Sequence, residues 1–157
     1  MTLICLIGSS YSGKSYFLEK LSKICDFTRI SLGDIFRAKG EKGICVTPED
    51  LKLEVRKALV KASIEGKNNN IILDNAFKNV EQAKAVIPEL KGFDIKVVYV
   101  ENHRKDVDLT SRGREDDINV SLKIREWEKN WPALYDYLRE RFVITTVLNN
   151  DYGFNII

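Results

Sequence analysis

Short runs of apolar residues alternate along the chain with longer stretches in which apolar residues recur every three or four positions. The short runs predict buried strands, because a strand covered on both faces needs apolar residues at consecutive positions. The longer stretches predict helices with one apolar face. This alternation predicts an α/β protein with three layers, in which helices flank a five-stranded parallel sheet. The expected strands are 2–7, 27–31, 70–74, 95–100 and 142–147.

Helices are expected between these strands, at 13–25, 34–39, 48–65, 80–89, 104–111 and 120–141. The third of them has the clearest start, since Thr47 is a good N-cap and Pro48 suits the first helical turn. The last contains Pro132, so we expect a bend near Trp131 and Pro132. No repeat or interdomain linker interrupts the pattern, which indicates a single domain over residues 1–157.

Composition and charge limit the partners that we expect for this domain. Of 157 residues, 44% are hydrophobic and 31% are charged, as in ordinary globular proteins, and the formal net charge is only +2. A charge this small does not indicate a nucleic-acid or membrane surface, and no apolar run is long enough to span a bilayer. The three cysteines lack metal-ligand spacing. We therefore expect a cytoplasmic monomer with reduced thiols that binds neither nucleic acid nor membrane.

The segment directly after the first predicted strand fits the phosphate-binding loop pattern G-x-x-x-x-G-K-[ST] at each fixed position. Its two glycines let the backbone turn N–H groups onto phosphate oxygens, and the following helix adds the positive end of its dipole. Lys14 would contact the β- and γ-phosphates, and the Ser15 hydroxyl would bind Mg²⁺. We predict that a nucleoside triphosphate binds to Gly8, Ser9, Ser10, Tyr11, Ser12, Gly13, Lys14, Ser15 and Tyr16.

Charged side chains also follow the second and third predicted strands. Asp74 ends the third strand, the usual place for a carboxylate that orients Mg²⁺, although an Asp there is also a common helix N-cap. Arg37 and Lys78 come shortly after the two strands. Because the carboxyl ends of parallel strands meet at one edge of a sheet, both cations would face the triphosphate. The sequence therefore predicts a second bound anion.

Four segments together resemble the nucleoside monophosphate kinases of the adenylate kinase family. Residues 33–37 match the family's G-D-x-x-R element, and residues 74–82 are similar to D-G-F-P-R-x-x-x-Q. Residues 114–117 are similar to R-x-D-D, with Arg125 eight residues later, and residues 131–135 to an aromatic-Pro-Leu-Tyr region. The segments occur in the family's order and cover nearly the whole chain.

The resemblance implies a P-loop kinase fold and a reversible transfer of the ATP γ-phosphoryl group to a nucleoside monophosphate, AMP or a deoxynucleotide being favoured. It implies an acceptor-binding arm at about 31–66 and a short lid at about 110–118. The catalytic residues carried over are Lys14, Arg112, Arg114 and Arg125. The residues around the acceptor would be Ser31, Leu32, Arg37, Ile44, Cys45, Val46, Asn75, Lys78 and Gln82. Ser15 and Asp74 would hold Mg²⁺, and no zinc is expected because the short lid has no cysteine.

Some positions depart from the family pattern and leave two other functions open. Asn75 and Lys78 replace a Gly and an Arg, and Lys cannot form the bidentate fork that Arg makes with phosphate. The spacing from Arg125 to Pro132 is about one helical turn shorter than usual. One alternative is a small-molecule kinase in which Asp34 activates a hydroxyl acceptor. The other is a nucleotide-binding regulator or degenerate kinase without useful turnover.

Overall fold

The computed structural model describes residues 1–40, 46–67, 70–103, 120–150 and 153–156. Its elements are β1 (Thr2–Ile7), α1 (Lys14–Ser22), β2 (Phe27–Ser31), α2 (Leu32–Ala38), α3 (Pro48–Ile64), β3 (Asn70–Asp74), α4 (Val80–Val86), the 3₁₀ turn η1 (Ile87–Leu90), β4 (Asp94–Asn102), α5 (Val120–Arg139), β5 (Ile144–Asn150) and β6 (Gly153–Ile156). The strands form one sheet in the order β2-β3-β1-β4-β5-β6. The α/β class and the parallel arrangement of the first five strands confirm the expectation from the sequence.

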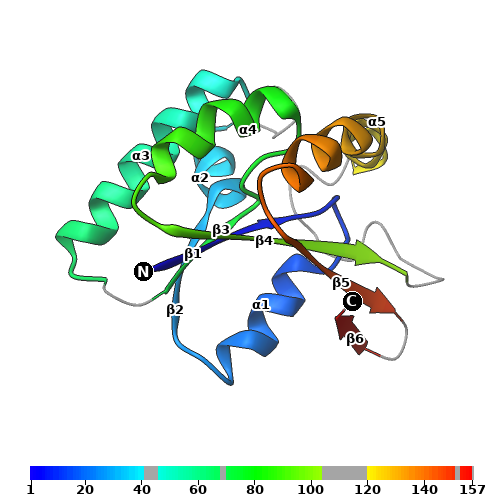
Figure 1. Ribbon diagram of the computed structural model, residues 1–157, viewed down its shortest axis with the longest axis horizontal. Helices are drawn as coiled ribbons and strands as arrows, with labels where there is room; N and C mark the ends of the chain where they lie inside the picture. Colours follow the sequence, from blue (N-terminus) through cyan, green and yellow to red (C-terminus); the bar gives the residue numbers. More distant parts are fainter. Residues whose placement is uncertain (41–45, 68–69, 104–119, 151–152, 157) are drawn as a thin grey trace.

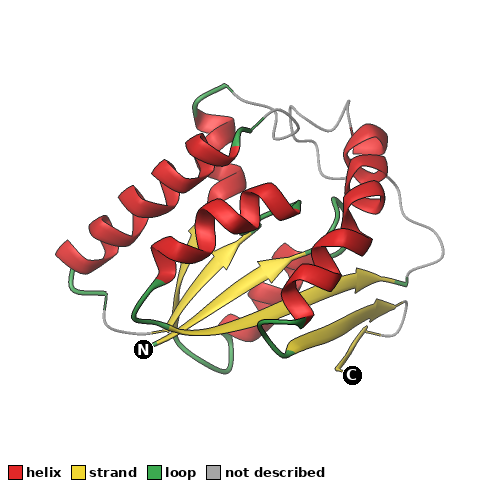
Figure 2. Ribbon diagram, turned by 45° about the horizontal axis from the view of Figure 1, so that its top comes forward, coloured by secondary structure: helices red, strands yellow, loops and turns green. Residues whose placement is uncertain are grey.

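Helices cover both faces of the sheet (Figure 1). One face packs against α1 through a cluster that includes Leu6, Leu18 and Val147. Figure 2 shows α2, α3, α4 and α5 on the opposite face. There the larger core joins side chains such as Phe36 and Leu138 to the sheet. Because both faces are covered, the central strand β1 is buried almost throughout, which explains its run of apolar residues.

Side-chain caps fix the starts of three helices on the α2–α5 side. The Thr47 hydroxyl accepts a hydrogen bond from the Asp50 N–H at 3.1 Å, and Pro48 occupies the first turn, as expected. The Asn79 side chain caps α4 in the same way. Ser31 caps α2 by accepting from the Asp34 N–H at 3.3 Å, so this helix begins at Leu32, two residues before the start expected from the sequence.

The sheet has six strands, so the expectation of five was wrong. The additional strand β6 pairs antiparallel with β5 and has only four residues. Its short apolar pattern gives a weak signal, since three or four residues do not establish a period of two. The strand predicted at 142–147 also lies later, at Ile144–Asn150. The helix expected at 104–111 falls outside the described residues.

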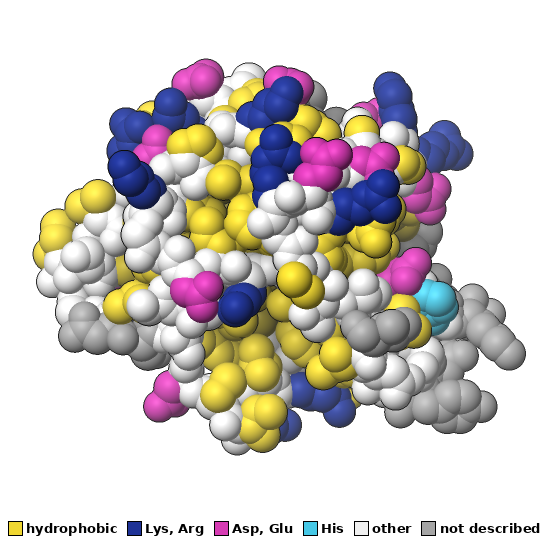
Figure 3. All heavy atoms as spheres, viewed as in Figure 1, with side chains coloured by type: hydrophobic (Ala, Val, Ile, Leu, Met, Phe, Trp, Pro, Cys, Tyr) yellow, Lys and Arg dark blue, Asp and Glu magenta, His cyan; other side chains and the backbone are white. Residues whose placement is uncertain are grey.

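The surface of the described part carries interleaved charges. Figure 3 shows Lys and Arg side chains over the helices in the upper half of the view, with Asp and Glu side chains between them. Several are paired, such as Arg56 with Glu89 at 2.7 Å and Lys39 with Glu54 at 3.0 Å. Within the described ranges, every helix is too short or too polar to cross a bilayer.

Candidate active site

One cavity lies at the carboxyl ends of β1, β2 and β3. Its walls include the loop and turn at residues 8–16, Arg29 and Ser31 of β2, and the start of α2. The segment after β3 and one face of α5 complete it. The predicted ATP-binding residues therefore share this cavity with the acceptor-binding residues that the structure describes: Ser31, Leu32, Arg37, Val46, Asn75, Lys78 and Gln82. Arg112, Arg114, Ile44 and Cys45 lie outside the described residues.

The turn between β1 and α1 needs both of its glycines for close approach. A Cβ on Gly8 would lie 2.6 Å from the Val100 carbonyl oxygen. Gly13 has a φ of 97°, and a Cβ there would lie 2.1 Å from Nδ2 of Asn149. Since real Cβ atoms do not approach other atoms this closely, the fixed glycines of the pattern are explained by packing as well as by backbone conformation.

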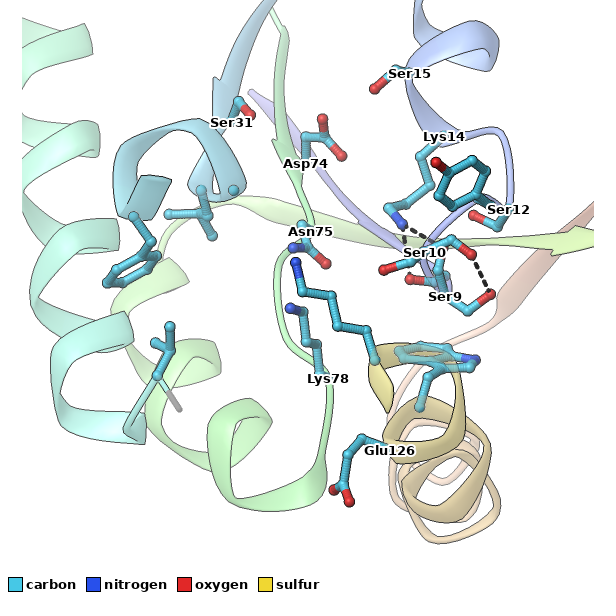
Figure 4. Close-up of a pocket in the computed structure, with 18 of the residues that line it drawn as sticks. Ser9, Ser10, Ser12, Lys14, Ser15, Ser31, Asp74, Asn75, Lys78 and Glu126 are labelled. Carbon is cyan, nitrogen blue, oxygen red and sulfur yellow. Dashed lines mark hydrogen bonds between the residues drawn. The ribbon is translucent and has the colours of Figure 1, made fainter. Parts of the chain in front are cut away.

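Lys14 and Ser12 complete this turn. The Lys14 ammonium donates to the carbonyl oxygens of Gly8 at 2.8 Å and Ser9 at 3.0 Å, so its side chain curls over the loop (Figure 4). Ser12 is almost fully buried, and its hydroxyl has no hydrogen-bond partner among the described residues. A buried hydroxyl without a hydrogen-bond partner is unfavourable and needs an explanation. A loop that binds an anion offers one, because the anion would supply acceptors that the protein alone lacks.

Asn149 of β5 supports the loop and was missed in the sequence. Its Nδ2 donates to the Ser12 carbonyl oxygen at 3.0 Å, and its side chain is buried against Gly13. The backbone carbonyl oxygen of Asn149 accepts a hydrogen bond from the backbone N–H of His103 at 2.6 Å. The available signal was a polar residue after the apolar positions of a predicted strand, at the same sheet edge as the loop.

Asp74 and Ser15, the two predicted metal ligands, are both hydrogen-bonded by Arg29. Nε and Nη2 of Arg29 donate to Oδ2 of Asp74 at 3.0 and 2.5 Å, and Nη2 lies 3.4 Å from the Ser15 hydroxyl. The Asp74 side chain is 7% exposed and the Arg29 side chain 37%. Sequence reasoning missed Arg29, although an arginine within a five-residue strand of an α/β sheet is a signal in itself.

On the acceptor side, Arg37 and Asp34 form an ion pair one helical turn apart. Burial alone would raise the pKa of the Asp34 carboxyl. Hydrogen bonds from Arg37 and Ser31, with the positive charges of Arg37 and Arg29, outweigh this effect and lower the pKa below its usual value. Asp34 is therefore held as a carboxylate that orients Arg37, and a base of lowered pKa is poorly suited to activating a hydroxyl acceptor.

Gln82 joins two segments of the acceptor side. Its Oε1 accepts from the Lys78 N–H at 2.8 Å, and its Nε2 donates to the Val46 carbonyl oxygen at 3.1 Å. The side chain is 5% exposed. Asn75 lies nearby with a φ of 66°, a left-handed conformation that Asn adopts more readily than most residues. Asn75 therefore keeps the backbone shape for which the family pattern uses Gly.

The face of α5 that lines the cavity differs from the prediction. Lys123, Glu126, Trp127 and Asn130 line it, at the i, i+3, i+4 and i+7 spacing of one helical face. Arg125 is exposed and lies outside the cavity wall. Two residues correspond to about 200° of rotation around a helix, so a side chain at 125 points away from one at 123.

Comparisons with known proteins agree with the motifs. No family model matches the chain. The chain is 27% identical to an adenylate kinase of Corynebacterium urealyticum, in an alignment of 158 positions that covers 89% of this chain and 87% of that protein. An adenylate kinase of Rhodococcus erythropolis is 27% identical over the same shares of the two chains. Another, of Corynebacterium diphtheriae, is 28% identical over 78% of this chain and 76% of that protein. The resemblance to nucleoside monophosphate kinases of the adenylate kinase family, indicated by the motifs, is confirmed over most of the chain.

Proposed function

We propose that this chain is an ATP-dependent nucleoside monophosphate kinase, with AMP or a deoxynucleoside monophosphate as acceptor. One observation carries the proposal: a phosphate-binding loop and two further cations, Arg37 and Lys78, line the same cavity from different elements. The similarity to adenylate kinases over 89% of the chain supports the same activity. Such an enzyme would act in the cytoplasm as a monomer, with ATP and a nucleoside monophosphate as its partners.

On the donor side, the N–H groups of residues 8–15 and the N-terminus of α1 would bind the phosphates of ATP. Lys14 would exchange its bonds to the Gly8 and Ser9 carbonyls for bonds to phosphate oxygens. Asn149 would keep the loop in place through its bond to Ser12. The donor half of the site thus depends on β1, α1 and β5 together.

On the acceptor side, Arg37 and Lys78 would bind the phosphate of the monophosphate, while Leu32 and Val46 would form an apolar wall against its base. The ion pair with Asp34 orients Arg37 in advance, which reduces the entropy lost on binding. Ser31, Asn75 and Gln82, with Ile44 and Cys45 from outside the described residues, would complete the acceptor site.

Transfer of a phosphoryl group needs positioning and stabilisation of charge on the equatorial oxygens more than covalent help. Lys14 would supply part of that stabilisation. We assign the remainder to Arg112 and Arg114 of the proposed lid, which lie outside the described residues. Lys123 of α5 lines the cavity and would add a further positive charge, whereas Arg125, the residue that the resemblance implies, lies outside the cavity wall.

Mg²⁺ bound with ATP would neutralise phosphate charge during transfer. The described residues contain no group of three or more Asp, Glu, His or Cys side chains that could hold a metal on their own. The Ser15 hydroxyl and the Asp74 carboxylate are hard oxygen donors, and Mg²⁺ is commonly held by one or two such groups together with substrate phosphates and water. The donor set therefore fits Mg²⁺ delivered with ATP.

A coupled assay with a panel of ribo- and deoxyribonucleoside monophosphates tests this function. We expect diphosphate formation, a loss mainly of kcat in Lys14→Ala, and a raised KM for the monophosphate in Arg37→Ala with ATP binding spared. Wild-type turnover in Lys14→Ala would contradict the assignment. Phosphorylation of a hydroxyl metabolite would favour the small-molecule kinase, and ATP binding without any product would favour a regulator.

A further inference from the structure

Arg29 lies where the divalent cation would be expected, and no role in the proposed reaction has been given to it so far. In the sheet, Arg29 is opposite Ile72 and Ser31 is opposite Asp74. Arg29 and Asp74 are therefore diagonal neighbours on the same sheet face, within reach of a long side chain. That face is covered by α1, which brings Ser15 to the same point (Figure 4 shows Ser15, Lys14 and Asp74 around one space).

The hydrogen bonds of Arg29 leave part of its guanidinium for a ligand. Nε and Nη2 are directed at Asp74, and Nη2 also faces Ser15. Nη1 makes no hydrogen bond to the described residues, and Arg29 is part of the cavity wall. The planar guanidinium has five N–H donors in a fixed arrangement that suits phosphate oxygens. Because Asp74 already orders the side chain, little further entropy would be lost when it binds an anion.

We propose that Arg29 is a phosphate-binding residue for the ATP triphosphate, held beside the phosphate-binding loop by Asp74 and Ser15, and that it performs part of the charge neutralisation usually left to the divalent cation. The inference rests on the proposed function, since it concerns the donor half of that site. Asp74 then has two functions: it positions Arg29 through Oδ2 and remains available to orient a hydrated Mg²⁺. The chain would bind metal-free ATP more tightly than the loop and Lys14 alone allow.

The test is calorimetric titration of ATP into the full chain, once with excess EDTA and once with MgCl₂. For Arg29→Gln we expect binding of metal-free ATP to weaken about 10- to 100-fold, the range for a lost charge-assisted hydrogen bond. Binding of ATP with Mg²⁺ should weaken by less than about threefold. Arg29→Lys keeps the charge but not the fork, and should recover only part of the metal-free affinity.

Arg56→Gln is the matched control. Arg56 makes the same kind of pair with Glu89, through Nε at 3.0 Å and Nη2 at 2.7 Å, but lies outside this cavity. It should leave both affinities unchanged. In Asp74→Asn the loss of metal-free affinity should be smaller than in Arg29→Gln, and adding Asp74→Asn to Arg29→Gln should cause little further loss, because both changes act on the same guanidinium.

For Arg29→Gln, equal weakening of ATP binding in EDTA and Mg²⁺ would overturn the inference, and so would no weakening in EDTA. It would also be overturned if ATP with Mg²⁺ bound more tightly to Arg29→Gln than to the wild type. A lower unfolding temperature with unchanged metal-free affinity would overturn it too, since it would show a purely structural pair. The proposed function is judged separately: diphosphate formation by the wild type would support it even if Arg29→Gln binds ATP normally. A wild type that phosphorylates no monophosphate would contradict the function and leave the binding result intact.

Discussion

Two residues other than glycine adopt left-handed backbone conformations beside the cavity: Tyr11 with a φ of 62° and Asn75 with a φ of 66°. Such conformations are costly for residues with a Cβ and occur preferentially at functional sites. Asn75 follows directly after β3, and its N–H and that of Ala76 both donate to the Leu6 carbonyl oxygen, at 3.0 and 3.2 Å. These bonds connect the segment after β3 to the end of β1 and maintain the conformation of Asn75.

We expect Asn75→Ala to lower the free energy of unfolding by about 1 kcal/mol, because Ala adopts the left-handed region less readily than Asn. Asn75→Gly should change it by less than about 0.5 kcal/mol, since Gly has no Cβ to oppose a positive φ. Urea unfolding of the three proteins measures both differences. A larger loss in Asn75→Gly than in Asn75→Ala would show that the Asn side chain, rather than the backbone conformation, is what the fold requires.

At this scale the sequence predicted most of the residues that meet in the cavity, because strand ends and a fixed loop pattern determine which side chains share a sheet edge. It did not predict the contacts of Arg29 and Asn149, because these contacts depend on which strands are neighbours and on how they are paired. Arg29 reaches Asp74 only because β2 and β3 pair with Ile72 opposite it, and a sequence does not display which strands are neighbours. Nor does the sequence show that Asn75, which replaces a Gly of the family pattern, holds a left-handed conformation.

Among the elements, β5 and the phosphate-binding loop are coupled through one side chain. Asn149 bonds to the Ser12 carbonyl oxygen and contacts Gly13, and Ser12 is almost fully buried. The phosphate-binding loop is thus held in place by β5, a strand that is far from it in sequence. This coupling explains why a polar residue is buried near the end of a strand in which Val147 packs against α1.

Asn149→Ala should weaken ATP binding about tenfold and lower the free energy of unfolding by about 1 to 3 kcal/mol, because it leaves the buried Ser12 carbonyl without its donor. Asn149→Asp should weaken ATP binding further, since its carboxylate cannot donate and adds negative charge beside the phosphates. Titration with ATP and urea unfolding measure the two effects. Asn155→Ala on the exposed part of β6 is the control and should change neither; unchanged ATP binding in Asn149→Ala would refute the coupling.

The helix α5 shows what the sequence can predict about an element and what it cannot. Its existence and C-terminal half followed from the spacing of apolar residues, but its phase near Arg125 did not. Tyr99 of β4, Trp127 and Trp131 form a stack, with ring centroids 4.2 Å apart for Tyr99 and Trp131 and 5.1 Å for the two tryptophans. Burial of these rings determines which face of α5 is directed inward, and therefore brings Lys123 rather than Arg125 to the cavity.

For the whole molecule, the decisive feature is the burial of β1 between the two layers of helices. The sequence predicted its bounds without error, because six consecutive residues with few polar side chains fit a strand covered on both faces. β6 was missed because it has only four residues and pairs antiparallel with β5 at the far edge of the sheet (Figure 1). Central strands are therefore easier to predict than edge strands, whose patterns are shorter and less apolar.

The buried Cys5 of β1 should make global stability fall at alkaline pH. Burial raises the pKa of its thiol from 9.0 to about 12, whereas in the unfolded chain the thiol ionises near 9. Below pH 9 both states keep the proton, and between pH 9 and 12 only the unfolded state loses it. The unfolded state then binds fewer protons, so the free energy of unfolding decreases as pH rises through this range.

We expect the difference in free energy of unfolding between wild type and Cys5→Ala to shrink by about 1 kcal/mol from pH 9 to pH 10, as measured by urea unfolding at each pH. The difference at pH 8 reports the cavity left by the Ala, and its change with pH reports the thiol, because other titrating groups are common to both proteins. A difference between wild type and Cys5→Ala that stays constant with pH would mean that the Cys5 thiol ionises within the folded sheet as easily as in the unfolded chain. Water would then reach Cys5 more readily than its complete burial indicates.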